Sequence, residues 1–489
     1  MKRACALLLL VLVTAFASAG ARAFTFAQPK SSPAPVQTDF PTPSPAPAAT
    51  ASPAAETAVP PALTPAAEPS PSPAPEASPS PSPEPAPSAE PAETPLDMPA
   101  SPSQDAAPAS FPAVFGLPME EETLPGYEPN PEWEEQLASF FKHSGAKTGV
   151  FILTRRGKPL AVYVAGNRDT HKNPTTLNTR FRIASVTKMV TAIGLMQLYE
   201  QGLIDLDDPI NYYLPMQVTN PACPDHPITM RQVLSHTSTL KQSSRYLPDW
   251  EHLQKSNSVF YKNLVPGEKY YYANLNGGLA GAMIEALSGQ SVNQYMTEHV
   301  FHPLGIDAAY SPNLLISQDN IGALMTRGGT TTSNASRQLK AAAEYDDTCD
   351  PAKHTDRTSG ALYISPWGLN RLMVTMALGG EYQGVRLLKE ETIRLMEADQ
   401  AWIEGSSVWG DSPYGLFLTH YTFGSSPWYG HQGRYNGLTS DAFYQPETGL
   451  TFVMVVNGYG GKSNDGLCNL ARSCLTWADG FGMEEEDGI

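Results

Sequence analysis

The segment from residue 24 to residue 112 restricts where this chain of 489 residues can fold. It consists mostly of Pro, Ala, Ser, Thr and Glu, holds 26 of the 46 prolines, and has one basic residue, Lys30, against nine acidic ones. So few apolar side chains cannot offset the entropy lost on ordering, and the prolines favour an extended backbone. We therefore predict a disordered linker over 24–112, a folded domain over 113–480 and an acidic tail over 481–489. A solvated spacer explains the linker, and a wall-spanning tether is the alternative.

The first 23 residues have the pattern of a secretory signal peptide. Lys2 and Arg3 precede a short apolar run, and Ala17-Ser18-Ala19 and Ala21-Arg22-Ala23 are candidate cleavage sites. The apolar run is shorter than the roughly 20 residues of a membrane-spanning helix, which favours removal over anchoring. The sequence therefore predicts a secreted or extracytoplasmic protein, which could be associated with the cell wall. Membrane attachment is expected only if the signal is not cleaved.

Charge and cysteine spacing exclude several kinds of partner. A net charge of −17 argues against nucleic acid, which requires basic surfaces. The histidines are scattered and no cysteine pair has zinc-site spacing, so we predict no metal site and no cofactor.

An exported chain permits disulfides among Cys223, Cys349, Cys468 and Cys474, and three pairings are open. Cys468 and Cys474 would face different ways on one helix, which disfavours that pair. We expect a monomer.

Hydrophobic periodicity predicts strands at both ends of the folded part and helices between them. The expected strands are 148–154, 159–165, 429–435, 437–444 and 450–457. The expected helices are 131–142, a helix from Ser185 to the cap at Gly202, 228–240, 275–287, 366–378 and 389–399. This order predicts an α+β fold, an α/β sandwich in which helices flank an antiparallel sheet of about five strands, plus a mainly helical subdomain.

The sequence Ser185-Val186-Thr187-Lys188 places a hydroxyl and an amine one turn apart at the start of a predicted helix. Positions i and i+3 share a helix face, so Lys188 can lie beside the Ser185 oxygen and accept its proton. Ser185 is therefore a candidate nucleophile. The same spacing occurs at Ser139/Lys142, Ser144/Lys147 and Ser238/Lys241, so the spacing alone does not decide.

Two later motifs strengthen the interpretation of Ser185. Tyr272-Ala273-Asn274 precedes a predicted helix, and in an extended loop its phenol and amide would face the same side. Tyr261-Lys262-Asn263 has the same spacing but no helix after it. His431-Gln432-Gly433 lies on a predicted strand, where the glycine lets the backbone approach a ligand closely.

In this order, the three motifs resemble those of the serine penicillin-recognising enzymes, namely class C β-lactamases and serine D-alanyl-D-alanine carboxypeptidases. The similarity covers roughly residues 130–460 and includes the flanking stretches 198–206, 228–240, 266–289 and 301–305. No Gly-x-Ser-x-Gly motif occurs, which disfavours an α/β-hydrolase. The resemblance implies a β-lactamase/transpeptidase-like fold.

The resemblance also implies an exported serine hydrolase that works through an acyl-enzyme. Ser185 would attack the substrate carbonyl, and Lys188 and Tyr272 would share the proton transfers, with the choice of base between them open. Asn274 would hold the substrate amide, and the backbone N–H groups of Ser185 and Arg434 would form the oxyanion hole. D-amino-acid amides such as D-Ala-D-Ala peptides are the expected substrates. An esterase, a β-lactamase and a non-catalytic protein that binds penicillin or wall peptides are the alternatives.

The third motif departs from the family pattern, which often has Lys-Thr-Gly. His431, the fourth catalytic candidate, would be only partly charged near pH 7 and would attract a substrate carboxylate weakly. We hypothesise that Arg434 makes the carboxylate contact. Strand alternation places Gln432 and Arg434 on the face opposite His431 and Gly433, so only one of these pairs can face the pocket. Gln432, Gly433 and Arg434 join Asn274 as substrate-binding candidates, and we interpret His236 as structural.

Overall fold

The computed structural model describes residues 124, 127–242, 250, 259–353, 357–403, 412–424, 426–461 and 467–483. The predicted signal, the predicted linker and residues 484–489 of the predicted tail lie outside these described residues. The chain divides into two units, Met1–Leu96 and Asp97–Ile489, and the description below concerns the second. Among the described residues, none of the helices combines the length and apolar character needed to cross a bilayer.

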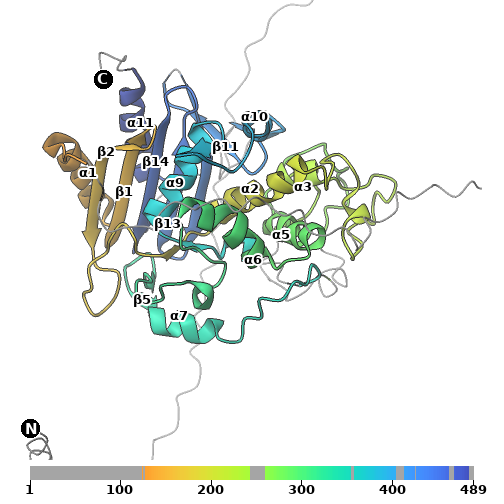
Figure 1. Ribbon diagram of the computed structural model, residues 1–489, viewed down its shortest axis with the longest axis horizontal. Helices are drawn as coiled ribbons and strands as arrows, with labels where there is room; N and C mark the ends of the chain where they lie inside the picture. Colours follow the sequence, from red (N-terminus) through yellow and green to blue (C-terminus); the bar gives the residue numbers. More distant parts are fainter. Residues whose placement is uncertain are drawn as a thin grey trace, which may run out of the picture. The chain divides into compact units, whose positions relative to one another are not determined.

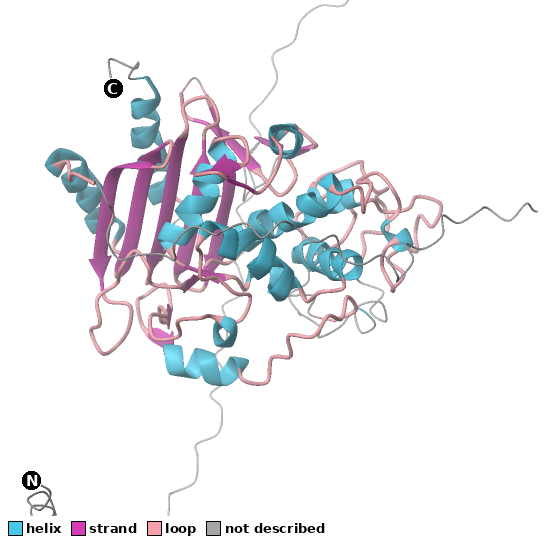
Figure 2. Ribbon diagram, viewed as in Figure 1, coloured by secondary structure: helices cyan, strands magenta, loops and turns pink. Residues whose placement is uncertain are grey.

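An antiparallel sheet of eight strands forms the centre of the second unit, and Figure 2 shows its longer strands as magenta arrows lying side by side. Thr148 pairs with both Gly166 and Asn457, so strands from the two ends of the domain are neighbours. In spatial order the strands are β2 (Lys158–Gly166), β1 (Thr148–Arg155), β14 (Leu450–Asn457), β13 (Leu438–Tyr444), β12 (Pro427–Tyr435), β11 (Thr419–Thr422), β10 (Ser412–Tyr414) and β9 (Ala401–Ile403).

The predicted fold class is confirmed, but the sheet is larger than the expected five strands. The additional strands are β9, β10 and β11, which extend the sheet beyond β12. They contain only 3, 3 and 4 residues, too few to show the alternation of apolar and polar side chains that marks a strand in a sequence. Their pairing is therefore visible only in three dimensions.

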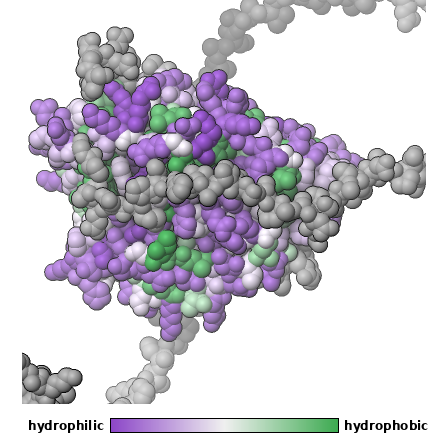
Figure 3. Space-filling view, viewed as in Figure 1, coloured by the Kyte–Doolittle hydropathy of each residue, from purple (hydrophilic) through white to green (hydrophobic). Residues whose placement is uncertain are grey.

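Helices cover both faces of the sheet (Figure 1). On one face, α1 (Pro131–Ser144) and α11 (Asn469–Asp479) bury a cluster of side chains that includes Leu137, Phe151, Phe443, Phe452 and Cys474. On the other face, α9 (Pro366–Ala377) and the helical region bury a larger cluster that includes Ile152, Ala442 and Val453. Successive side chains along each strand point to opposite faces of the sheet, so each strand contributes side chains to both buried clusters. The surface drawn in Figure 3 is mostly hydrophilic, with small apolar patches.

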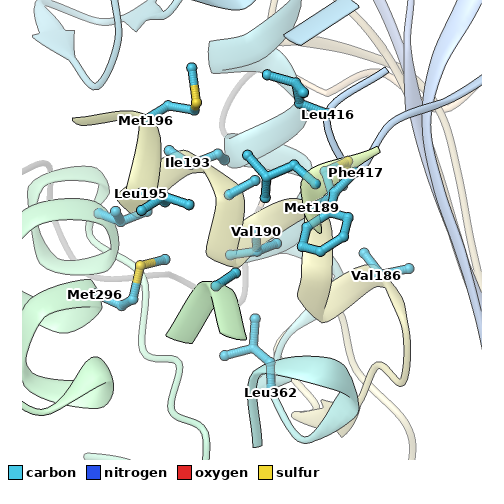
Figure 4. Packing of buried hydrophobic residues seen from close by; sticks show 14 of the residues in the cluster. Val186, Met189, Val190, Ile193, Leu195, Met196, Met296, Leu362, Leu416 and Phe417 are labelled. Atoms are coloured by element: carbon cyan, nitrogen blue, oxygen red, sulfur yellow. The ribbon is translucent and has the colours of Figure 1, made fainter. Parts of the chain in front are cut away.

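Helix α2 (Val186–Glu200) lies inside the helical region, with every residue from Val186 to Leu198 buried. Figure 4 shows Met189, Val190 and Ile193 among apolar side chains from other elements, including Met296 and Phe417. A helix that is apolar on all sides belongs in an interior, which fixes α2 and the residue that precedes it. Its neighbours are α3 (Met230–Leu234), α5 (Asn274–Ser288) and α6 (Val292–Met296).

Shorter elements complete the described chain. Three helices are α7 (Ala335–Ala342), α8 (Arg357–Gly360) and α10 (Glu390–Glu397). Single helical turns occur at η1 (Ile210–Tyr212), η2 (Thr297–Phe301), η3 (His302–Leu304), η4 (Pro312–Leu314) and η5 (Gly480–Met483). Three small ladders pair β3 (Phe181–Arg182) with β6 (Tyr363–Ile364), β4 (Leu324–Met325) with β5 (Thr331–Ser333), and β7 (Glu381–Tyr382) with β8 (Val385–Arg386).

Helix caps explain where several predicted helices begin and end. Thr229 and Gln232 form a capping box at α3, and Gly202 adopts φ 72° just after α2. The helix expected over 228–240 is shorter than predicted, because it ends at Leu234. Beyond it, His236 and Thr239 adopt left-handed φ angles of 58° and 64°, which a helix cannot contain.

The described fold continues past residue 480, where the acidic tail was expected to begin. Phe481 in η5 is buried, and its ring lies edge-on to Trp133 and Trp477 at centroid distances of 4.7 and 5.0 Å. Through these ring contacts, Phe481 packs against both α1 and α11. Cys223, Cys349, Cys468 and Cys474 are all free thiols in the structure.

Candidate active site

Ser185 stands immediately before α2, at the position where a serine hydroxyl commonly caps a helix. Its side chain makes no capping hydrogen bond, so the hydroxyl is not used to satisfy the helix N-terminus. The preceding residue, Ala184, adopts φ 49°, a left-handed conformation that is strained for alanine. The backbone thus turns sharply before the helix and presents the Ser185 oxygen to neighbouring elements.

Lys188 lies one turn further along α2 and its side chain is completely buried. Its Nζ is 3.3 Å from Ser185 Oγ, 2.7 Å from Asn274 Oδ1 and 2.6 Å from the carbonyl oxygen of Ser359. Burial holds the pKa of Lys188 well below its usual value. A neutral amine has two N–H donors and one lone pair. It can therefore donate to the two carbonyl-type oxygens and accept the proton of Ser185.

Tyr272 reaches the same oxygen from the loop before α5. Its hydroxyl is 2.8 Å from Ser185 Oγ and 3.4 Å from Asn274 Oδ1. Ala273 between them is extended, with φ −140°, so residues 272 and 274 face one side, as the sequence spacing predicts. A phenol and an amine therefore converge on one alcohol oxygen, an arrangement suited to moving protons during acyl transfer.

His236 supports the Tyr272 ring from behind. The two ring centroids are 4.5 Å apart, and His236 is buried. Its Nδ1 lies 2.8 Å from Asn276 Nδ2 and accepts from the backbone N–H of Ala273 at 3.3 Å, which leaves the hydrogen on Nε2. Burial, with smaller effects from Lys188 and His431, keeps the pKa of His236 well below its usual value. This neutral ring fixes the loop that carries Tyr272.

His431 is fully enclosed and does not behave as the sequence suggested. Its Nδ1 lies 2.6 Å from the carbonyl oxygen of Gln432, and its Nε2 is 3.4 Å from the Tyr414 hydroxyl. Burial lowers the pKa of His431 to about 3, with a smaller effect in the same direction from the nearby Lys188. The expectation of a partly charged histidine near pH 7 was therefore wrong, because an enclosed imidazole loses the hydration that stabilises its charge.

Strand alternation separates the remaining candidates of the third motif. Gly433 faces Ser185: a Cβ atom at this position would lie 2.9 Å from the Ser185 backbone nitrogen and would collide with the Ile183 carbonyl. Gln432 points to the opposite face, where its amide bonds Thr419 Oγ1 at 3.0 Å and Tyr421 Oη at 3.1 Å.

Arg434 follows the same alternation as Gln432. Its charge acts on Asp441 and Tyr421, which lie on the α11 side of the sheet. The structure therefore brings Ser185, Lys188, Tyr272, Asn274, His431 and Gly433 together, but not the side chains of Gln432 and Arg434. The hypothesis that the Arg434 guanidinium reaches the pocket disagrees with this register, since adjacent strand residues face opposite ways.

Sequence reasoning missed the Ser359 carbonyl, which is 171 positions from Lys188. One signal was present. Gly277 and Gly281 are one turn apart on α5, and a Cβ at Gly277 would lie 2.8 Å from Ser359 Cα. These glycines let α8 approach α5, which places the Ser359 carbonyl beside the amine. No group of three or more metal-ligating side chains is gathered in the part of the chain that the structure describes.

Comparison with protein families agrees with this geometry. The family model described as Beta-lactamase matches residues 100–473. The chain belongs to the Beta-lactamase family. This confirms the resemblance drawn from the motifs, and it places the chain in a family of serine hydrolases.

Two curated relatives of this family match only part of the chain. Protein flp from Staphylococcus aureus is 26% identical over 189 residues, covering 35% of this chain and 37% of that protein. The D-alanyl-D-alanine-carboxypeptidase/endopeptidase AmpH from Escherichia coli is 29% identical over 181 residues, covering 35% of this chain and 46% of that protein. The chain thus spans less than half the length of these relatives.

A solved structure confirms the fold of the Beta-lactamase family. The D-amino acid amidase from Ochrobactrum anthropi shares 21% identity, with a TM-score of 0.56, over 72% of this chain and 100% of that one. At this identity, the likeness concerns the fold.

Proposed function

We propose that the protein hydrolyses amides of D-amino acids, with D-Ala-D-Ala peptides as expected substrates, through an acyl-enzyme on Ser185. One observation carries the proposal. The Lys188 amine and the Tyr272 hydroxyl lie 3.3 and 2.8 Å from the same Ser185 oxygen. The amidase and carboxypeptidase likenesses support the substrate class.

The proposed acylation uses the neutral Lys188 amine as the base. Ser185 Oγ attacks the substrate carbonyl carbon while its proton passes to Lys188 Nζ, so that a tetrahedral oxyanion forms. The proton then passes through the Tyr272 hydroxyl to the leaving nitrogen. The C–N bond breaks, the amine departs with the proton, and the acyl group remains on Ser185. The lowered pKa of Lys188 is what makes the first transfer feasible near neutral pH.

The oxyanion would be stabilised by two backbone N–H groups. The first belongs to Ser185, at the positive end of α2. The second belongs to Arg434. Tyr435 and Leu438 flank a two-residue turn, so the next pair, Arg434 and Thr439, has N–H groups directed away from each other. The Arg434 N–H then points to the open edge of β12, beside Gly433 and Ser185.

Deacylation reverses these transfers with water as the nucleophile. The water gives one proton to Lys188 and attacks the acyl carbon. The bond to Ser185 Oγ breaks, and Ser185 regains the proton through Lys188 or Tyr272. A carboxylic acid leaves, and the site returns to its starting state.

The test compares the wild type with Ser185→Ala on three substrates: a D-Ala-D-Ala peptide, a short-chain nitrophenyl ester and a chromogenic cephalosporin. We expect the wild type to cleave the peptide and Ser185→Ala to lose at least about a thousandfold in kcat. Ser139→Ala is the matched control, because Ser139 and Lys142 repeat the spacing on α1, far along the chain from the site. Turnover of the ester alone would refute the peptidase assignment, and full activity in Ser185→Ala would refute the mechanism.

The intact mass of the protein after exposure to a penicillin distinguishes an enzyme from a binding protein. A Ser185-dependent adduct that disappears with time supports hydrolysis, whereas a permanent adduct would indicate capture without turnover.

Export of the protein belongs to the same proposal. Recovery outside the cytoplasm of a chain that lacks residues 1–23 would support it, and a chain that stays inside with those residues would refute it.

A further inference from the structure

The site as described leaves a substrate carboxylate without a recognised partner. The sequence hypothesis assigned this contact to Arg434, whose register directs its side chain toward α11. His431 is enclosed and neutral, and burial also lowers the pKa of Lys188. Peptides of the proposed class carry carboxylates, and the chain as a whole is acidic, with a net charge of −17. A local cation is therefore needed to bring such peptides to Ser185.

Arg182 contacts two segments that adjoin the site, one at Gly360 and one at Tyr435. It is the last residue of β3, three positions before Ser185. Its Nε donates to the Gly360 carbonyl at 2.9 Å, and Gly360 follows Ser359, whose carbonyl accepts from Lys188. Its guanidinium carbon is 4.4 Å from the centroid of the Tyr435 ring. Tyr435 in turn follows Arg434, so both anchors of Arg182 adjoin backbone groups of the proposed machinery.

The guanidinium retains donors for a ligand. Arginine has five N–H donors in a rigid fork, and the Gly360 contact uses the one on Nε. Within the described ranges, no carboxylate forms an ion pair with Arg182, and its side chain is only partly buried. Stacking on Tyr435 holds the plane of the fork, which lowers the entropy lost when a carboxylate binds both Nη atoms.

A second arginine increases the positive potential nearby. Arg357, at the other end of α8 from Gly360, lies 4.2 Å above the Tyr345 ring. The charges of Arg182 and Arg357 both oppose the burial effect that raises the pKa of the Tyr363 phenol, so both lie within electrostatic reach of it. Two cations thus lie within reach of the Tyr363 phenol in a protein whose net charge is −17.

We propose that Arg182 binds a carboxylate of the substrate through its free Nη donors and so determines which peptides reach Ser185. The inference rests on the proposed function, because it names the recognition element of that acyl transfer. The carboxylate can belong to the acyl part that stays on Ser185 or to the leaving D-amino acid. Both have the same chemistry, and a bidentate contact with arginine suits either.

Four peptides separate these sources. Succinyl-Ala-D-Ala-D-Ala carries one carboxylate on the acyl part and one at its end. Two analogues replace one carboxylate each by an amide, and the fourth replaces both. We expect the wild type to prefer a carboxylate-bearing peptide over the doubly amidated one. In Arg182→Gln the ratio of their kcat/KM values should fall about tenfold to a hundredfold, mainly through KM. The singly amidated analogue that loses this preference identifies which carboxylate Arg182 binds.

Two further variants sharpen the result. Arg182→Lys keeps the charge but loses the fork, so its ratio should lie between those of wild type and Arg182→Gln. Arg337→Gln is the matched control on α7, because Arg337 also makes one bond to a backbone carbonyl, that of Thr332 at 2.9 Å. Its ratio should equal that of the wild type.

The inference is overturned if Arg182→Gln lowers all four kcat/KM values by the same factor, since that would show a structural role only. It is also overturned if the wild type does not distinguish the four peptides, a result that needs no variant to fold. In both cases hydrolysis itself persists, so the proposed function stands. Failure of the wild type to cleave any of the four would instead refute the proposed function.

Discussion

Asp441 offers a test of the electrostatics on the face of the sheet away from Ser185. It lies on β13 opposite Gln432, and its side chain is fully buried near Cys468. Neither carboxyl oxygen has a hydrogen-bond partner in the described part of the chain. Burial raises the pKa of Asp441 from 3.8 to about 7, and the charge of Arg434 offsets only part of that effect. Ionisation of Asp441 therefore destabilises the folded state.

The sign and size of the effect follow from linkage. The pKa of the folded chain is higher than that of the unfolded chain, so the folded form holds the proton more tightly. The contribution of Asp441 to stability is greatest below about pH 4, falls as the pH rises toward about 7, and then levels off. One pKa unit corresponds to about 1.4 kcal/mol, so the ionised Asp441 costs about 4 kcal/mol, as an order of magnitude.

Asp441→Asn removes the charge and keeps the shape. We expect its advantage in stability over the wild type to grow between pH 5 and pH 8, by about 2–3 kcal/mol or several degrees in Tm. Thermal or urea unfolding at the two pH values measures this. Asp225→Asn is the control, because Asp225 is exposed and its substitution should have the same small effect at both pH values. An Asp441→Asn effect that does not change with pH would refute the reasoning.

Three further substitutions test the site. Gly433→Ala should lower kcat at least about tenfold, because its Cβ would press on the Ser185 backbone, whereas Gly328→Ala, with its nearest neighbouring atom at 3.8 Å, should not. His431→Gln should leave the shape of the kcat/KM profile between pH 5 and 8 unchanged, since His431 is already neutral there; a lost inflection near pH 6.5 would contradict this. His236→Phe should destabilise by about 1–3 kcal/mol in urea unfolding, because Asn276 and Ala273 lose an acceptor, with the exposed His302→Phe as control.

Local signals explain what the sequence could predict. The β1–β2 hairpin, the capped helices and the β13–β14 pair are encoded by periodicity and turn residues within about 20 positions of one another. The i, i+3 and i, i+2 spacings placed Ser185 beside Lys188 and Tyr272 beside Asn274. Alternation also predicted that only one pair of the third motif could face the pocket, and the structure places Gly433 against Ser185, on the same strand face as His431.

The missed features depend on distant packing. His431 is enclosed by elements distant from it in the sequence, so its neutral state could not be predicted from the residues around it. Ser359 and Arg182 contribute through contacts with residues far along the chain. Strands β9 and β10 are too short to carry a periodic pattern. Each of these requires the assembled structure.

The pairing of β1 with β14 has a consequence for how the chain reaches its native state. Thr148 meets Asn457, so the edge of β1 that faces β14 stays open until translation has passed that residue. Contacts so distant in sequence form slowly, and an unsatisfied strand edge readily attaches to other chains. A chain that stops before β14 would leave both β1 and β13 with a bare edge. We expect such a fragment to aggregate rather than form a smaller working enzyme.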